Sequence, residues 1–259
     1  MTIFKLPSRF IAAAGAVVLL AAAPSATQAQ QFSPAQRDEI GNIIKDYLLK
    51  NPELLQEVME ELDKRQTTAK AESRQSAIKT LAGTLFNSPR QVVLGNPKGD
   101  VTFVEFFDYN CGFCKTAMND MLTLMKDDTK LKVVLKEFPV LGEDSIAAAQ
   151  VAVAVNMQDK TGKKYFEFHR KLLGGRGRAN GARALAVARE IGLDVARIEK
   201  DMKSDEVRKT LQESFNLARA LGLNGTPSYV IGSEVVEGAR GLDTLKEAIN
   251  TTRCGKPTC

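Results

Sequence analysis

The chain of 259 residues is long enough for one good-sized domain with an appendage, and it carries a formal net charge of +5 at pH 7. This surplus is small, and its one local basic cluster lacks the interleaved aromatic side chains that stack on nucleic-acid bases. We interpret the cluster as a solvated surface and expect no nucleic-acid partner. Its members are Lys163, Lys164, Arg170, Lys171, Arg176, Arg178 and Arg183.

Residues 1–29 have the pattern of a secretion signal peptide. Lys5 and Arg9 make a basic start, an apolar stretch follows over residues 10–23, and Thr27-Gln28-Ala29 matches a small-x-Ala cleavage site. The apolar stretch is short for a membrane span, although an uncleaved N-terminal anchor is the alternative. We therefore expect a mature chain that begins near Gln30 and is exported to the periplasm, an oxidising compartment where disulfides persist.

Residues 30–88 form a predicted N-terminal helical appendage with its linker. Ser33 and Gln36 have the spacing of a capping box, and Asn51-Pro52 ends one helix and begins another. These helices make a predicted hairpin over residues 33–62, and a polar linker, helical or flexible, follows over residues 63–76. One face of each helix is apolar, through Ile40, Ile43, Ile44, Tyr47, Leu48, Leu54, Leu55, Val58, Met59 and Leu62.

Two helices of this length cannot remain folded on the burial that they give each other. They must pack on another surface, which is either the rest of the chain or further copies of themselves. Because a polar linker separates them from the remaining sequence, we favour self-association and expect a homo-oligomer.

Residues 89–252 predict an α/β domain. Strands are expected at 91–94, 101–107 and 131–138, and the helix after the second strand makes a βαβ unit with a parallel strand pair. A helical insertion follows over about residues 144–222, and strands at 228–231 and 234–237 precede a last helix at 242–250. This order predicts a thioredoxin-like fold with an inserted helical domain, preceded by the helical appendage.

Cys111 and Cys114 are separated by Gly112-Phe113 and lie between the second strand and its helix. At a helix N-terminus, unpaired backbone N–H groups and the helix dipole stabilise a thiolate, which is the attacking species in disulfide exchange. The pattern therefore predicts a redox site. A zinc site is the alternative, but the remaining Cys and His residues, Cys254, Cys259 and His169, have poor spacing for four ligands.

Three segments of the chain resemble the DsbA family of exported thiol-disulfide oxidoreductases: residues 106–115, residues 136–142 and residues 225–228. The appendage is similar to that of ScsC-type members, some of which associate through it. The resemblance implies that Cys111 is the exposed nucleophile and Cys114 the buried resolving cysteine. It also implies that Phe113, which has neither charge nor imidazole, stabilises the thiolate less than His does in strongly oxidising relatives.

The same resemblance implies roles for four residues near the cysteine pair. Pro227 matches the family's cis-proline, with an ordinary trans-proline as the alternative, and Thr226 before it would modulate reactivity. Glu105 matches a buried carboxylate that accepts or relays the proton of Cys114, and Lys136 matches its lysine partner. An isolated carboxylate in a buried strand needs such a partner, whereas the alternative is a Glu105 that faces solvent.

The remaining candidate ligands are interpreted as structural. His169 is expected to pack in a helix of the insertion, and Met121, Met125 and Met157 to fill the core or a groove. In the tail, residues 253–259, Cys254 and Cys259 are expected to form a structural disulfide, because exported cysteines usually pair. A second redox pair that exchanges electrons with Cys111–Cys114, or metal capture by the tail, are the alternatives.

Together these observations predict an exported thiol-disulfide oxidoreductase that acts on folding secreted proteins and needs no cofactor beyond its own disulfide. The oligomerisation segment favours isomerase activity, with an unidentified membrane protein as the redox recycling partner. The alternatives are a monomeric dithiol oxidase, a copper(I)-binding thiol protein, since paired thiolates suit soft metals, or a purely structural disulfide.

Overall fold

The computed structural model describes residues 32–259, and the chain divides into a smaller unit up to Glu60 and a larger unit over Glu61–Cys259. The predicted signal peptide lies outside the described residues. Helix α1 spans Pro34–Lys50 and begins with the predicted capping box, in which Ser33 Oγ accepts from Gln36 N and Gln36 Oε1 accepts from Ser33 N. Asn51 ends this helix through hydrogen bonds from its backbone and side chain to the Tyr47 carbonyl.

Helix α2 spans Glu53–Asn87 and is continuous, so residues 63–76 are helical rather than a flexible linker. No residue of α1 is buried, and the apolar side chains of the predicted hairpin are largely exposed. The exposed fractions of Ile43, Tyr47, Val58 and Met59 are 61%, 58%, 63% and 70%. These faces therefore have the composition of a helical interface without the burial that would stabilise one.

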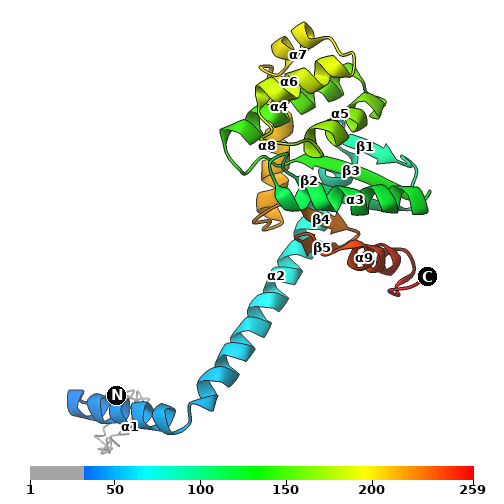
Figure 1. Ribbon diagram of the computed structural model, residues 1–259. Coiled ribbons are helices and arrows are strands. Elements are labelled where there is room, and N and C mark those ends of the chain that lie inside the picture. The colour runs from blue at the N-terminus through cyan, green and yellow to red at the C-terminus, as the bar shows by residue number, and fades with distance from the viewer. Residues whose placement is uncertain (1–31) are drawn as a thin grey trace, which may run out of the picture. The chain divides into compact units, whose positions relative to one another are not determined.

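The larger unit is built on a five-stranded mixed sheet in the order β1-β3-β2-β4-β5 (Figure 1). The strands are β1 Val92–Gly95, β2 Val101–Phe107, β3 Leu131–Glu137, β4 Ser228–Ile231 and β5 Glu234–Glu237. The central pair, β2 and β3, is parallel, and helix α3 (Gly112–Asp127) connects the two strands, which confirms the predicted βαβ unit. Strands β4 and β5 form the predicted hairpin beside β2.

Alternate side chains of β2 enter two hydrophobic cores, one on each face of the sheet. Phe103 and Phe107 join a core with α3, the insertion and α9 (Leu242–Cys254), whereas Val104 and Phe106 face the opposite side. That second core is closed by α8 (Asp205–Ala220) and by the end of α2, which contributes two buried side chains, Ile78 and Leu85 (Figure 1). The last turns of α2 therefore pack as part of the larger unit, although the sequence predicted a boundary at residues 88 and 89.

The helical insertion extends from α4 to α8. Its other helices are α4 Glu143–Gln158, α5 Lys163–Leu173, α6 Gly181–Glu190 and α7 Val195–Asp201. Asp194 and Ser204 cap α7 and α8 at the predicted positions. Helix α4 is the buried helix of the insertion, since its Ala and Val side chains are buried around most of its circumference. Within residues 32–259, no helix has the length and apolar character that crossing a membrane requires.

Two buried lysines of β3 bind the C-terminal end of α2. Lys132 Nζ donates to the Phe86 carbonyl at 2.8 Å and to Asn87 Oδ1 at 2.9 Å. Lys136 Nζ donates to the Thr84 carbonyl at 3.0 Å and pairs with Glu213 at 3.5 Å. The last carbonyls of a helix have no intrahelical partner and carry the negative end of its dipole. The two lysines therefore supply hydrogen-bond donors to these carbonyls and positive charge to this end of the helix.

Replacing Lys136 with methionine should lower the free energy of unfolding by about 1–3 kcal/mol, because the Thr84 carbonyl and Glu213 lose a buried charged partner. Urea unfolding at pH 7, followed by circular dichroism, measures the change. Lys98→Met, at an exposed lysine of the β1–β2 turn, is the matched control and should stay within about 0.5 kcal/mol of the parent. Equal stabilities of the two variants would show that Lys136 does not hold α2 in place.

Candidate active site

Cys111 is the N-cap residue of α3. The chain leaves β2 at Phe107, turns so that Cys111 N donates to the Asp108 carbonyl at 3.1 Å, and enters the helix at Gly112. Cys111 Sγ accepts a hydrogen bond from Cys114 N at 3.3 Å. The sulfur therefore lies at the positive end of the helix, as the sequence predicted, and both cysteines are free thiols in this structure. Cys114 is buried as expected, whereas the predicted exposure of Cys111 is wrong, because only 6% of this residue is exposed.

The two thiols have opposite acidities. The pKa of Cys111 is lowered from 9.0 to about 6, chiefly by a hydrogen bond with the Cys114 side chain, helped by Thr226 and by backbone N–H groups and opposed by burial. The pKa of Cys114 is raised far above 9.0, first by the same hydrogen bond, then by burial and the negative charge of Glu105. Cys111 is thus the thiolate and Cys114 the protonated partner.

The segment before β4 completes the surroundings of Cys111. The Thr226-Pro227 peptide bond is cis, so the trans alternative is wrong. In its protonated form Cys111 Sγ donates to the Thr226 carbonyl, whose oxygen lies 3.2 Å away. The structure therefore brings Thr226 into contact with the nucleophile and places Pro227 next to it, although their roles in exchange remain predictions.

Glu105 lies inside the sheet, 2% exposed, on the face of β2 that carries Phe103 and Phe107. Its predicted burial is confirmed, and the solvent-facing alternative is wrong. Burial raises the pKa of Glu105 to about 8, and the negative charges of Cys111 and Asp120 contribute in the same direction. Its carboxyl group therefore holds a proton more readily than an exposed carboxyl group does, and its negative charge in turn raises the pKa of Cys114.

Lys136 is not the partner of Glu105, and this prediction was wrong. Glu105 pairs in register with Leu135 of β3, so the next residue of that strand, Lys136, points to the opposite face of the sheet. There it pairs with Glu213 and the end of α2. Its pKa is lowered to about 8 by burial, with Glu213 opposing the shift. We assign Lys136 to the stability of the fold and not to the cysteine pair.

Asp108 and Asn110 fasten the active-site turn to the insertion, and the sequence analysis assigned no role to either. Asp108 accepts four hydrogen bonds of 2.7–3.0 Å from the backbone N of Asn110, Val140 and Leu141 and from Ser145 Oγ. Asn110 exchanges two hydrogen bonds with the Ala179 backbone and donates a third to Ser145. The sequence signal was available, because Asp-x-Asn before a helix typically forms such a turn.

Tyr229 is a second residue that the sequence analysis missed. It lies opposite Glu105 in the antiparallel β2–β4 register, and its ring packs on Phe103 with 5.1 Å between centroids. Its hydroxyl is buried and makes no hydrogen bond within the described residues. Burial first, and then the Glu105 charge, raise the pKa of this phenol well above 10. Tyr229 is thus a protonated phenol opposite Glu105. The sequence could have indicated this position, because side chains alternate between the two faces of a strand and Tyr229 lies two residues after Pro227.

Replacing Asp108 with alanine should lower the free energy of unfolding by about 3 kcal/mol, because four donors lose a charged acceptor. Denaturant unfolding of the reduced protein measures this loss. Glu199→Ala removes an exposed carboxylate of α7 and should change stability by no more than about 0.5 kcal/mol. If both variants unfold alike, the hydrogen bonds of Asp108 contribute no net stability.

Exposed apolar side chains lie between the two cysteines and on the segments that bind Asp108 of the active-site turn. Phe113, between the cysteines, is 70% exposed, and Val140 and Leu141 are about half exposed on the loop that binds Asp108. Ile146 in the first turns of α4 is exposed to a similar degree. Such a patch beside a reactive thiolate is typical of a surface that binds apolar side chains of another chain.

The candidate ligands outside the pair are structural in this fold. His169 is buried, lies 4.6 Å from the Phe107 ring centroid and has its pKa lowered to about 3 by burial, so it is neutral. Met121 is buried, while Met125 and Met157 are partly buried against the same core. Cys254 and Cys259 form the predicted disulfide. The four-cysteine zinc alternative is therefore wrong for this state of the chain, and the role of the tail disulfide remains a prediction.

Comparison with known proteins gives two family matches. Residues 102–250 match the DSBA-like thioredoxin domain, and residues 36–69 match the N-terminal domain of the copper resistance protein ScsC. The fold and the cysteine pair define the class of thiol-disulfide oxidoreductases, and the chain belongs to its DsbA-like thioredoxin family. Its N-terminal segment places it with the members that carry an ScsC N-terminal domain.

Three solved structures illustrate the similarity. A thioredoxin-like oxidoreductase from Silicibacter pomeroyi DSS-3 is 43% identical, with 66% of this chain and 96% of that chain covered and a TM-score of 0.63. The thiol-disulfide exchange protein α-DsbA2 from Wolbachia pipientis is 32% identical, with coverages of 70% and 97% and a TM-score of 0.64. A linker-deletion mutant of Proteus mirabilis ScsC is 25% identical, with coverages of 88% and 100% and a TM-score of 0.65.

The chain also matches longer proteins of another description. It is 25% identical over 168 residues to a Na(+)/H(+) antiporter NhaA 1 from Salinispora arenicola, of which it spans a quarter of the length.

Proposed function

We propose that the chain is an exported thiol-disulfide oxidoreductase that acts on secreted or periplasmic proteins and isomerises their disulfides. The observation that carries this proposal is the unequal cysteine pair: Cys111 at a helix N-terminus with a pKa of about 6, and Cys114 with a raised pKa. A thiolate at neutral pH attacks disulfides, whereas its protonated neighbour is not nucleophilic and reacts only after a mixed disulfide has formed.

Exchange begins when Cys111 Sγ attacks one sulfur of a substrate disulfide, so that a Cys111–substrate disulfide forms and the other substrate sulfur leaves as a thiolate. Two outcomes are then open. A second substrate thiolate can attack the mixed disulfide, which rearranges the substrate and returns Cys111 as a thiolate. Alternatively Cys114 loses its proton to Glu105 and attacks Cys111, which releases a reduced substrate and leaves Cys111–Cys114 oxidised.

The smaller unit supports isomerisation over simple oxidation. The apolar faces of α1 and of the start of α2 are exposed in the single chain, so copies of the chain gain buried area by associating through them. An oligomer presents several cysteine pairs to one substrate. Such an assembly also restricts the access of a membrane oxidant to each site, which favours the dithiol form that isomerisation needs.

The test uses a scrambled multi-disulfide protein as substrate, with the chain from Gln30 to Cys259 and its Cys111→Ser variant. Recovery of substrate activity that depends on Cys111 is the expected result. Rapid oxidation of reduced substrate without repair of the scrambled form would overturn the isomerase assignment and leave a dithiol oxidase. No exchange in either assay would remove the oxidoreductase assignment itself.

Substituting Ile44 and Met59 with lysine should convert the oligomer to a monomer, because both side chains lie in the exposed apolar faces. Sedimentation equilibrium measures the state of association. Loss of repair with retained dithiothreitol oxidation is expected, since the cysteine pair is untouched. Lys45→Met together with Glu60→Gln changes charge on the same helices and should leave the association intact. An oligomer that survives the lysine substitutions contradicts this interface.

A copper(I) protein is the second candidate, and the ScsC N-terminal match motivates it. Residues 36–69, which carry that match, contain no Cys or His and a single soft ligand, Met59, so a pair of thiolates for copper(I) would have to come from Cys111 and Cys114. Competition with a chromophoric copper(I) chelator distinguishes the two functions. Stoichiometric retention of copper by a chain that does not exchange disulfides would favour the copper candidate.

A further inference from the structure

A basic loop is fixed against the residues that flank the cysteine pair. We call residues 174–180, between α5 and α6, the arginine loop, because it contains Arg176 and Arg178. Asn110 exchanges two hydrogen bonds of 2.8 Å with the Ala179 backbone, and Lys115 Nζ donates to the Gly175 carbonyl at 3.1 Å. Asn110 precedes Cys111 and Lys115 follows Cys114, so the loop is held at both ends of the redox motif.

Two guanidinium groups at this loop lack an acidic partner. Arg178 pairs with Asp144, but Arg176 and Arg183 form no ion pair within the described part of the chain. Arg183 Nε is buried without a hydrogen-bond partner, so this group has lost water without gaining a carboxylate. Arg183 Nη2 lies against Gly175, in the space that a Cβ on that residue would occupy. The glycine thus lets the Arg183 guanidinium lie against the loop.

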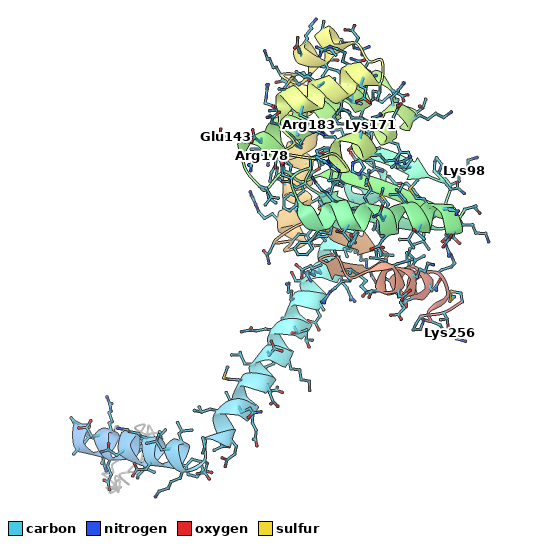
Figure 2. All side chains as sticks on the ribbon, in the orientation of Figure 1. Lys98, Glu143, Lys171, Arg178, Arg183 and Lys256 are labelled. Carbon is cyan, nitrogen blue, oxygen red and sulfur yellow. A yellow bond between two sulfur atoms is a disulfide. The ribbon has the colours of Figure 1, made fainter. Side chains whose placement is uncertain are left out.

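The loop also adjoins the exposed apolar patch beside Cys111. Arg178 Nη2 donates to the Leu141 carbonyl at 3.4 Å, and the amide of Leu141 binds Asp108. Figure 2 shows Arg178 and Arg183 on the same side of the larger unit as Lys171, around the α5–α6 connection. The first turn of α4 carries two acidic groups, Glu143 and Asp144, and Asp144 is paired with Arg178.

We propose that the arginine loop selects client segments that carry acidic side chains next to the reacting cysteine, a specificity that rests on the oxidoreductase function proposed above. A client carboxylate satisfies the unpaired guanidinium groups of Arg176 and Arg183, because the planar fork of arginine matches a carboxylate in a bidentate geometry. Apolar client side chains then contact Phe113 and Leu141. The loop holds the client in place while its thiolate or disulfide exchanges with Cys111.

Two dithiol peptides of equal length and apolar content test this specificity, one with Glu and one with Lys on both sides of the cysteines. Each is oxidised by the Cys111–Cys114 disulfide, so that two peptide thiols become a disulfide and the protein pair becomes two thiols. The unsubstituted chain should oxidise the Glu peptide about tenfold faster at low salt, and the preference should shrink as salt rises. The double variant Arg176→Gln, Arg183→Gln should lower the preference for the Glu peptide at low salt to about twofold or less.

A matched double variant, Arg189→Gln with Lys98→Gln, removes the same charge at exposed positions outside the loop and should keep the full preference. The rate with dithiothreitol, which is uncharged, is measured for every variant and corrects for effects on the cysteine pair. Equal rates for both peptides with the unsubstituted chain would overturn the proposal, as would an unchanged preference in the loop variant. Absence of exchange with dithiothreitol as well would instead overturn the proposed oxidoreductase function.

Discussion

Replacing Glu105 with glutamine should slow the release of substrate from the mixed disulfide by about 100-fold at pH 7, which is the low end of the range for general base catalysis. Release requires Cys114 to lose its proton, and burial together with its hydrogen bond to Cys111 holds the Cys114 pKa far above neutral. The Glu105 carboxylate is close enough to raise that pKa, and its own pKa of about 8 suits a proton acceptor near neutrality. Acid quenching followed by mass spectrometry measures the lifetime of the mixed disulfide.

Removing Glu105 also removes a negative charge that raises the pKa of Cys114, and this effect acts in the opposite direction. Faster release in the glutamine variant would therefore show that the charge outweighs the proton transfer. Asp120→Asn is the matched control, because this substitution removes a charge that raises the pKa of Glu105 and leaves Glu105 itself in place. In that variant the pH dependence of release should move to lower pH while the maximal rate is kept.

Cys111 should react with iodoacetamide with a midpoint near pH 6 instead of near its ordinary 9.0. At pH 6 about half of Cys111 is then thiolate, roughly 500 times the population of a thiol with the ordinary pKa. The rate of alkylation between pH 4 and 10, together with thiolate absorbance at low wavelength, gives the midpoint. Cys114→Ala should raise it, because the Cys114 side chain is the largest cause of the lowered pKa. A midpoint above pH 8 in the parent chain would contradict the geometry at the helix N-terminus.

The same acidity makes the stability of the reduced protein depend on pH. A thiol whose pKa is lower in the folded than in the unfolded state releases its proton first in the folded state. Its contribution to stability is present in full above pH 9.0, declines as pH falls toward 6, and is absent below that value. The oxidised protein has no such group. Urea unfolding of both forms should therefore show the reduced form gaining stability relative to the oxidised form between pH 6 and pH 9.

Local patterns predicted the parts of this fold that depend on neighbouring residues. The alternation and apolar runs of the strands, the Ser33 capping box and the position of Cys111 at a helix start are confirmed, because each depends on a few consecutive side chains. The cis peptide before Pro227 was predicted through the family resemblance, and it too is confirmed.

The wrong prediction at Lys136 has a specific physical cause. The pairing of Glu105 with Lys136 came from the family resemblance, but the strand register decides which residues share a face, and a shift of one residue reverses the assignment. The contacts of Asp108 with the Val140–Leu141 backbone and of Asn110 with Ala179 were missed for a related reason. They join segments that are about 30 and 70 residues apart, and no local periodicity reports such pairs.

The end of α2 limits how this protein can be divided. Ile78 and Leu85 are structural members of the sheet's second core, and the carbonyls of Thr84 and Phe86 accept hydrogen bonds from the buried lysines of β3. A fragment that starts at β1 loses both and exposes Val104, Phe106 and Val134 to water. Helix α2 therefore cannot be removed or replaced as a whole without disrupting the core of the larger unit. Gene fusion or proteolytic trimming preserves a folded redox domain only when the cut falls upstream of residue 77.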